Sequence, residues 1–204
     1  MNDIDITTEK QNNNVKELLL AQIRECFARV VSTHKTHEKQ ADILVQNEKF
    51  WKCIQIILSV IVPGTFLATL DWLFGHEKIW TLIGLLLSAV LAVINLYFNN
   101  SNYGVELLRH EKIAVQLWDI RERYLSLITD LMINSIDIDS ARKIRDDLMI
   151  RLENIYIIAS RTSQTAYKKA QKGLKFNEEL TFSSNEIDML LPEKLRLNVN
   201  KEEQ

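Results

Sequence analysis

Proline and glycine are scarce in this chain of 204 residues, which contains 2 Pro and 5 Gly. Neither occurs between Met1 and Val62. These residues are the strongest local breakers of helices. The alternation of apolar and polar residues that is typical of strands is also missing. The sequence therefore predicts an all-α protein whose first helix is unusually long.

Cysteine is equally scarce, and the charges nearly cancel. Cys26 and Cys53 lie far apart, which argues against a disulfide framework and suits a reducing compartment. Cys26 falls on an apolar helix face, so we expect it to be a small core residue. The formal net charge is −2, which gives no reason to expect direct nucleic-acid binding.

Motifs that carry catalysis are absent from the sequence. It has no GxGxxG or GxxxxGK[ST] loop for phosphate and no GxSxG motif around a nucleophilic serine. His34 and His37 could share one helix face, but catalytic zinc needs three protein ligands and no third lies near. We expect a solvated helix surface there, and neither enzyme activity nor a metal or cofactor.

Basic residues are missing from two apolar runs, 53–74 and 79–98, and Asp71 is the one acid within them. As helices, runs of about 20 residues would each be about 30 Å long, the thickness of a bilayer's hydrocarbon core. A backbone in lipid must bond to itself. The runs therefore predict a two-helix transmembrane hairpin over 53–98 with the bilayer as its surroundings.

Basic residues flank the outer ends of the hairpin, with Lys49 and Lys52 before it and Arg109 and Lys112 after it. The short connection between the two runs has Lys78 as its one Lys or Arg residue. The positive-inside rule then places both termini in the cytoplasm. Aromatic residues that favour membrane interfaces lie at the ends of the runs: Trp51, Trp72, Trp80 and Tyr97.

The hairpin divides the chain into a cytosolic helix over 1–52, the membrane part over 53–98 and a helical cytosolic region over 99–204, which we expect to form one domain. Residues 1–14 are polar and are expected to fray. A helix after the hairpin should bury one apolar face: Leu107, Ala114, Trp118, Leu125, Ile128 and Met132.

A further helix is expected to run unbroken from Ala141 through Ala170, because its apolar residues recur every three or four positions. A turn over 134–139 should precede it, with Asp139 as the helix cap. Ser183 and Glu186 have capping-box spacing at the start of a last short helix. The apolar residues that follow should dock it on the other helices: Leu190, Leu191 and Leu195.

Polar and small residues form a stripe on each apolar run. The residues are Gln55, Ser59, Thr65 and Thr69 on the first run, where Pro63 should kink the helix, and Gly84, Ser88, Ala92 and Asn95 on the second. The stripes either pack the two helices together or line a wet path when several hairpins assemble. The lack of buried charge argues against a proton relay or an ion-coupled pump.

Three segments after the hairpin carry recognisable motifs: WDIRERYLSLITDL over 118–131, TAYKKAQ over 165–171 and EIDMLLP over 186–192. These segments resemble the SLATT family, and the resemblance covers nearly the whole chain. SLATT proteins are two-span membrane effectors of bacterial conflict systems. They occur beside nucleotide second-messenger synthases, nucleotide-sensing SLOG domains or reverse transcriptases.

The resemblance implies antiviral defence by abortive infection, in which a homo-oligomer permeabilises the inner membrane on activation. It also implies a partner from a second-messenger system or a reverse transcriptase. The motif residues Trp118, Arg121, Glu122, Arg123 and Tyr124 are candidate cytosolic contacts. Ion pairing on the helix surface is the simpler role for the three charged residues, and core packing for the two aromatic ones. The alternative function is a membrane-anchored scaffold that recruits a cytosolic partner without forming a pore.

Overall fold

The computed structural model describes residues 3–69, 77–100 and 102–192, and the side chains of 11–61, 82–98 and 102–192. Within these ranges the chain is all-α and has no strand. Its helices are α1 (Asp3–Thr69), α2 (Glu77–Asn100), α3 (Tyr103–Met132), α4 (Ile138–Ile158), α5 (Gln164–Phe176) and α6 (Ser184–Leu190).

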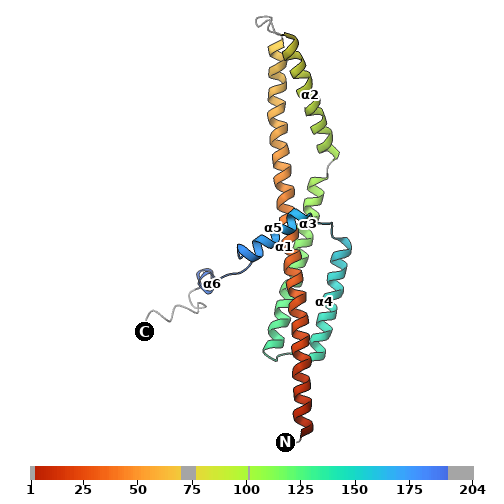
Figure 1. Cartoon of the computed structure of the whole chain (residues 1–204), viewed down its shortest axis with the longest axis vertical. Helices are drawn as coiled ribbons and strands as arrows, with labels where there is room; N and C mark the ends of the chain where they lie inside the picture. The colour runs from red at the N-terminus through yellow and green to blue at the C-terminus, as the bar shows by residue number, and fades with distance from the viewer. Residues whose placement is uncertain (1–2, 70–76, 101, 193–204) are drawn as a thin grey trace, which may run out of the picture.

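α1 is the axis of the molecule (Figure 1). Its 67 residues make a helix about 100 Å long at about 1.5 Å per residue. The expected continuity from the N-terminal region into the first apolar run is confirmed. The expected frayed segment over 1–14 is wrong from Asp3 onward, because no proline or glycine interrupts the helix there and residues 11–14 keep their polar side chains in solvent.

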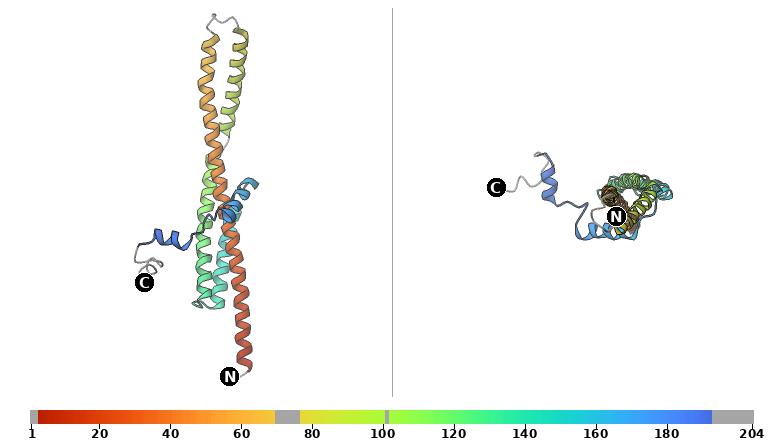
Figure 2. Two further views of the ribbon diagram at one scale, coloured as in Figure 1. Left: turned by 60° about the vertical axis from the view of Figure 1, so that its left-hand side comes forward. Right: turned by 90° about the horizontal axis from the view of Figure 1, so that it is seen from above.

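The lower half of the molecule is a bundle of α1, α3 and α4, in which α3 packs against both of the others (Figure 2). The core of this bundle joins Ile23 and Val30 of α1 to Leu117 and Leu127 of α3, with Leu148 from α4. Cys26 is buried in the same core, as predicted.

The predicted core face of α3 is wrong for Trp118, Leu125 and Met132, which are 51%, 43% and 64% exposed. The residues one position earlier are buried instead: Leu117, Tyr124 and Leu131. α3 carries apolar residues on two adjacent faces, and only one of them can lie against α1. The second face remains open.

The expected unbroken helix from Ala141 through Ala170 is also wrong, because residues 159–163 separate α4 from α5. Ser163 ends the break by capping α5, where its Oγ accepts a hydrogen bond from the Ala166 N–H at 3.2 Å. Its own N–H donates to Gln40 Oε1 of α1 at 2.8 Å. Ser and Thr side chains in this segment compete with helical hydrogen bonding. The break lets α5 cross α1.

The structure also shows which residues cap the starts of α4 and α6. Asp137, rather than Asp139, caps α4, and its side chain accepts a hydrogen bond from the Ser140 N–H at 2.9 Å. The capping box of Ser183 and Glu186 at α6 is confirmed. However, α6 extends away from the bundle (Figures 1 and 2) and Leu190 is 76% exposed, so the expected docking is wrong for the described residues. Leu195 lies outside them.

Candidate functional site

The upper half of the molecule is a hairpin of α1 and α2 whose outer surface is apolar. A stretch within Leu82–Met132 is, by length and composition, the one part of the described chain suited to crossing a membrane, and none of its apolar window is buried. Core helices of soluble proteins bury such residues. The surroundings that cover this surface therefore lie outside the chain.

A polar contact joins the two helices of the hairpin. Gln55 Nε2 of α1 donates to Asn95 Oδ1 of α2 at 2.5 Å. Both residues are half-buried, as are Leu58 on α1 and Leu87 and Leu91 on α2, which lie on the same inner faces. The structure thus brings two of the predicted stripe residues into direct contact between the spans.

Of the other stripe residues that the structure describes, one lies beside the inner face of the hairpin and three lie on its outer surface. Gly84 is half-buried beside the inner face of α2, whereas Ser59, Ser88 and Ala92 are exposed. The two serine hydroxyls donate within their own helices, Ser88 to the Gly84 carbonyl at 2.8 Å and Ser59 to the Ile56 carbonyl at 2.7 Å. Ser59, Ser88 and Ala92 therefore leave a small, weakly polar outer surface that does not hold this hairpin together.

The side chains of several predicted hairpin residues lie outside the described ranges. Pro63, Thr65 and Thr69, together with Asp71, Trp72 and Trp80, lie outside the described side chains. The backbone of α1 continues as a helix through Pro63 to Thr69.

The motif residues of α3 fall into separate environments. Tyr124 is fully buried, whereas Trp118 is exposed. Arg121 Nε lies 3.1 Å from Glu122 Oε1, and Arg123 Nε donates to Asp119 Oδ2 at 2.9 Å. The charged members are thus engaged in ion pairs, and the five residues do not form one surface.

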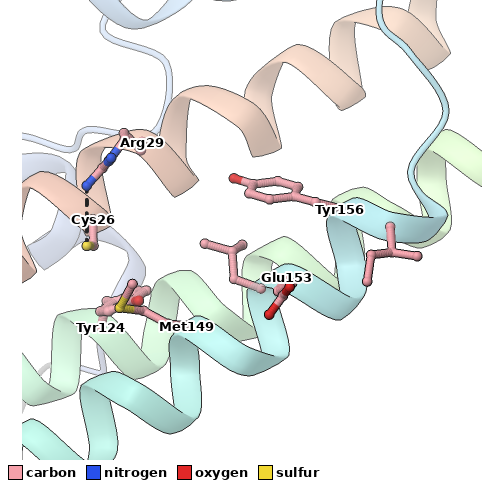
Figure 3. Close-up of a pocket in the computed structure, with 8 residues that line it drawn as sticks. Cys26, Arg29, Tyr124, Met149, Glu153 and Tyr156 are labelled. Atoms are coloured by element: carbon pink, nitrogen blue, oxygen red, sulfur yellow. Dashed lines mark hydrogen bonds between the residues drawn. The ribbon is translucent and has the colours of Figure 1, made fainter.

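A groove of 460 Å³ opens between α1 and α4 above Tyr124 (Figure 3). Arg29 Nη2 lies 3.6 Å from Cys26 Sγ at one side of it, and Glu153 lies on the α4 side. Burial and the neighbouring Cys26 raise the pKa of Tyr124 to about 12, so its hydroxyl remains protonated at neutral pH. The rest of the lining is mainly apolar and suits packing more than catalysis: Met149, Leu152, Tyr156 and Ile157.

Between the bundle and the hairpin lies a layer of buried polar side chains that the sequence analysis did not predict. We call it the polar band; its residues are His34, Lys35, Thr36, His37 and Gln40 of α1 and His110 of α3. His34 and His37 are only 5% and 4% exposed, so the expected solvated surface is wrong. α3 covers this face of α1, and His110 of α3 places its Nδ1 atom 2.9 Å from the Nδ1 atom of His37. The signal was present in the sequence: residues 32–42 of α1 are polar on every side, yet the helix continues through them.

The histidines of the polar band are held neutral. Burial, with the neighbouring His110 and His34, lowers the pKa of His37 to about 4. Burial also lowers the pKa values of His34 and His110. One ring of the His37–His110 pair must donate and the other accept, which a neutral pair can do. Across the described residues, no three potential ligands are grouped so that they could hold a metal ion.

An ion-pair cluster closes the polar band on the side of α5. Glu179 Oε2 lies 2.8 Å from Lys35 Nζ and 2.9 Å from Lys39 Nζ. Hydrogen bonds from these two lysines lower the pKa of Glu179 to about 2. Burial alone would lower the pKa of Lys35, but hydrogen bonds to Glu179 and Glu38 outweigh it and raise the pKa. The segment after α5 is thereby fastened to α1.

Gly173 of α5 lies directly against the Glu179 side chain. A Cβ atom at this position would lie 2.9 Å from the carboxyl carbon of Glu179, so the carboxylate that pairs with the two lysines would have to shift. Ala166, Ala170 and Gly173 are the buried residues of α5. Their small size lets the helix approach α1 closely.

Comparison with protein families matches residues 19–186 to SLATT_4, described as SMODS and SLOG-associating 2TM effector domain family 4. Neither the curated proteins nor the solved structures give a match. The matched region covers most of the chain and confirms the resemblance found in the motifs. Its description names an effector domain with two membrane helices, in keeping with the apolar hairpin. The chain therefore belongs to the SMODS and SLOG-associating 2TM effector domain family 4.

Proposed function

We propose that this protein is a pore-forming effector that assembles with further copies of itself and permeabilises the bacterial inner membrane when its conflict system is activated. In this proposal the runs 53–74 and 79–98 both span the bilayer. Residues 1–52 and 99–204 lie in the cytoplasm and belong, with the hairpin, to one domain.

The observation that carries the proposal is the uncovered surface of the hairpin. The apolar window of α2 is not buried within the chain, and Ser88 and Ala92 lie on its exposed side. Two helices cannot enclose a path, so a pore requires several hairpins. Small residues allow helix backbones to approach closely in lipid. The outer face of α2 is therefore suited to contact with a second hairpin.

The chemistry of the hairpin favours an unselective path. Asp71, three residues from the end of the first run, is the one charged side chain within 53–74 and 79–98. Transporters and proton pumps place ionisable groups within their spans. Leakage of small ions and dyes is the output that such a surface can support.

A membrane-anchored scaffold is the second candidate function. It is favoured by the second apolar face of α3, on which Leu108, Val115 and Trp118 are exposed. A cytosolic partner could pack there while the hairpin acts only as an anchor. That partner would come from the associated second-messenger system or be a reverse transcriptase.

The substitution Ser88→Leu tests the proposal. Leucine is at least as favourable as serine in a membrane span, so insertion should be retained. Its larger side chain should separate helices that approach at Ser88. We expect dye entry after activation to be lost in Ser88→Leu and retained in Ala89→Leu, a matched change at an exposed neighbouring position of α2. Equal dye entry in both variants and in the wild type would show that this face neither assembles nor conducts.

A further inference from the structure

α6 stands apart from the rest of the described chain. It follows α5 through residues 177–183 and extends away from the bundle on one side of α1 (Figures 1 and 2). Within the part of the chain that the structure describes, α6 contributes no residue to the hydrophobic core. We call residues 177–192, which include α6, the arm.

The arm carries exposed apolar side chains on one face of α6. Ile187 and Leu190 are three positions apart, so they lie on the same side of the helix. Phe182 directly precedes the Ser183 cap, the position from which a side chain packs against Ile187 in a hydrophobic staple. Phe182, Ile187 and Leu190 are all exposed. A continuous apolar face of this kind is typical of a surface that contacts another molecule.

The groove between α1 and α4 is an apolar surface of suitable size. Its wall on α4 includes Met149, Tyr156 and Ile157, which are exposed although they are apolar or aromatic (Figure 3). Its volume of 460 Å³ lies within the range of about 300–1,000 Å³ that is usual for binding pockets. The groove can therefore take up apolar side chains from a short helix.

The arm and the groove lie at the same level of the molecule but on opposite sides of it. α6 is level with the C-terminal half of α4, which forms one wall of the groove (Figure 1). α6 extends to one side of α1 and α4 lies on the other, both in Figure 1 and in the view from above in Figure 2. The arm therefore points away from the groove of its own chain. Two copies that stand upright in one membrane bring the arm of one to the height of the groove of the next.

We propose that α6 of one copy docks in the groove between α1 and α4 of a neighbouring copy, with Ile187 and Leu190 against its apolar wall. This inference rests on the proposed function, which places several copies side by side, and it names the contact that joins them. A contact between two different surfaces repeats from copy to copy and forms a ring where the rotation between copies closes. A ring of hairpins is the arrangement that the proposed pore requires.

Disulfide cross-linking between two kinds of copies tests this contact. The native thiols of the full chain are removed by Cys26→Ala and Cys53→Ser. One kind of copy then carries Leu190→Cys on α6 and the other carries Ile157→Cys at the groove, each with its own tag. Both are expressed together with the activated partner system, and the membranes are oxidised. We expect a disulfide that joins the two tags.

Ile158→Cys is the matched control for the groove position. Ile158 is also exposed, but it lies beside Val115 in a different hollow between α3 and α4. The yield of the joined species should be lower by about tenfold or more with Ile158→Cys than with Ile157→Cys, because its side chain starts from another side of α4.

A second pair of variants tests whether the apolar face of α6 makes the contact. In the copies with Leu190→Cys, Ile187→Asn should lower the yield by about tenfold or more, because it removes an apolar side chain that the contact buries. Met189→Asn makes the same change on the other side of α6, where Met189 is 78% exposed, and should leave the yield unchanged.

Dye entry and species larger than the monomer, without a disulfide above the level of the Ile158→Cys control, would contradict this inference alone. Absence of both dye entry and larger species would overturn the proposed function, and this inference with it. A disulfide between two copies that each carry Leu190→Cys would show that α6 pairs with α6 instead. A disulfide that forms only when both cysteines are in one chain would show docking within the chain. Either result would overturn the proposed contact.

Discussion

At the scale of single residues, the polar band combines a neutral pair with a charged cluster. The neutral pair, His37 and His110, satisfies its ring nitrogens without burying a charge. The charged cluster buries Lys35, whose amine is stabilised by carboxylates from two segments, Glu38 and Glu179. Removal of one member of such a cluster leaves the others without compensation.

The substitution Glu179→Gln should loosen α5 from α1. The carboxylate is shared by Lys35 and Lys39, and an amide cannot neutralise either lysine. We expect hydrogen exchange to become faster in α5 and to change little in α4. Glu178→Gln, at an exposed neighbouring position, is the control. Because the pKa of Glu179 is lowered from 4.5 to about 2, its contribution should be complete above pH 4.5 and lost as pH falls toward 2.

The histidine pair should make the bundle sensitive to acid in a different range. Since the pKa of folded His37 is about 4 and its ordinary value is 6.5, the unfolded state binds the proton first. Stability should be constant above pH 6.5 and fall as pH drops toward 4. His34 and His110, whose pKa values are also lowered by burial, act in the same direction.

Variants of His37 and His110 separate the effect of their hydrogen bond on stability from their effect on its acid dependence. His110→Ala leaves His37 buried without its partner and should cost about 1–3 kcal/mol at neutral pH. His37→Leu combined with His110→Leu should cost less and weaken the acid dependence. Both effects are measured by thermal unfolding in detergent across this pH range. An unchanged acid dependence in the double variant would contradict the role assigned to the pair.

At the scale of helices, the sequence predicted those features that depend on the positions of helix-breaking residues and on the lengths of apolar runs. α1 could be traced because nothing interrupts it before Pro63, and the hairpin because its runs match a bilayer. The buried face of α3 could not be chosen, since α3 has two apolar faces and the position of α1 selects one. At the break before α5, the Ser163 N–H donates to Gln40, far away in sequence, and this contact could not be read from the local pattern. His37 and His110 are likewise 73 positions apart, so their contact appears only in the fold.

The hairpin offers a test at this scale. Asn95→Leu removes the hydrogen bond from Gln55 and leaves a polar amide without its partner in the apolar half of the molecule. Hydrogen bonds between membrane helices contribute about 0.6 kcal/mol on average and up to about 1.7. We expect a loss in this range in the free energy of unfolding in mixed detergent micelles. Ser88→Ala, whose hydroxyl bonds only within α2, should have a smaller effect, and equal losses would contradict the interhelical role of Asn95.

At the scale of the whole molecule, α1 joins the bundle to the hairpin without a break. A change in the packing of α3 or α5 on α1 acts on the same helix that enters the hairpin. The polar band lies between the two halves, where α1 contacts both α3 and α5. This continuity gives a physical route from a partner on the bundle to the membrane.

In the proposed function, activation assembles hairpins into a leaking structure. This assembly is tested most directly by measuring dye entry and cross-linked species in the same cells after the protein is expressed with its activated partner system. We predict that dye entry appears together with species larger than the monomer, and that reporters at both termini remain cytoplasmic. A protein that stays monomeric in cells whose membranes remain intact under the same activation would contradict the account and leave the scaffold as the better description.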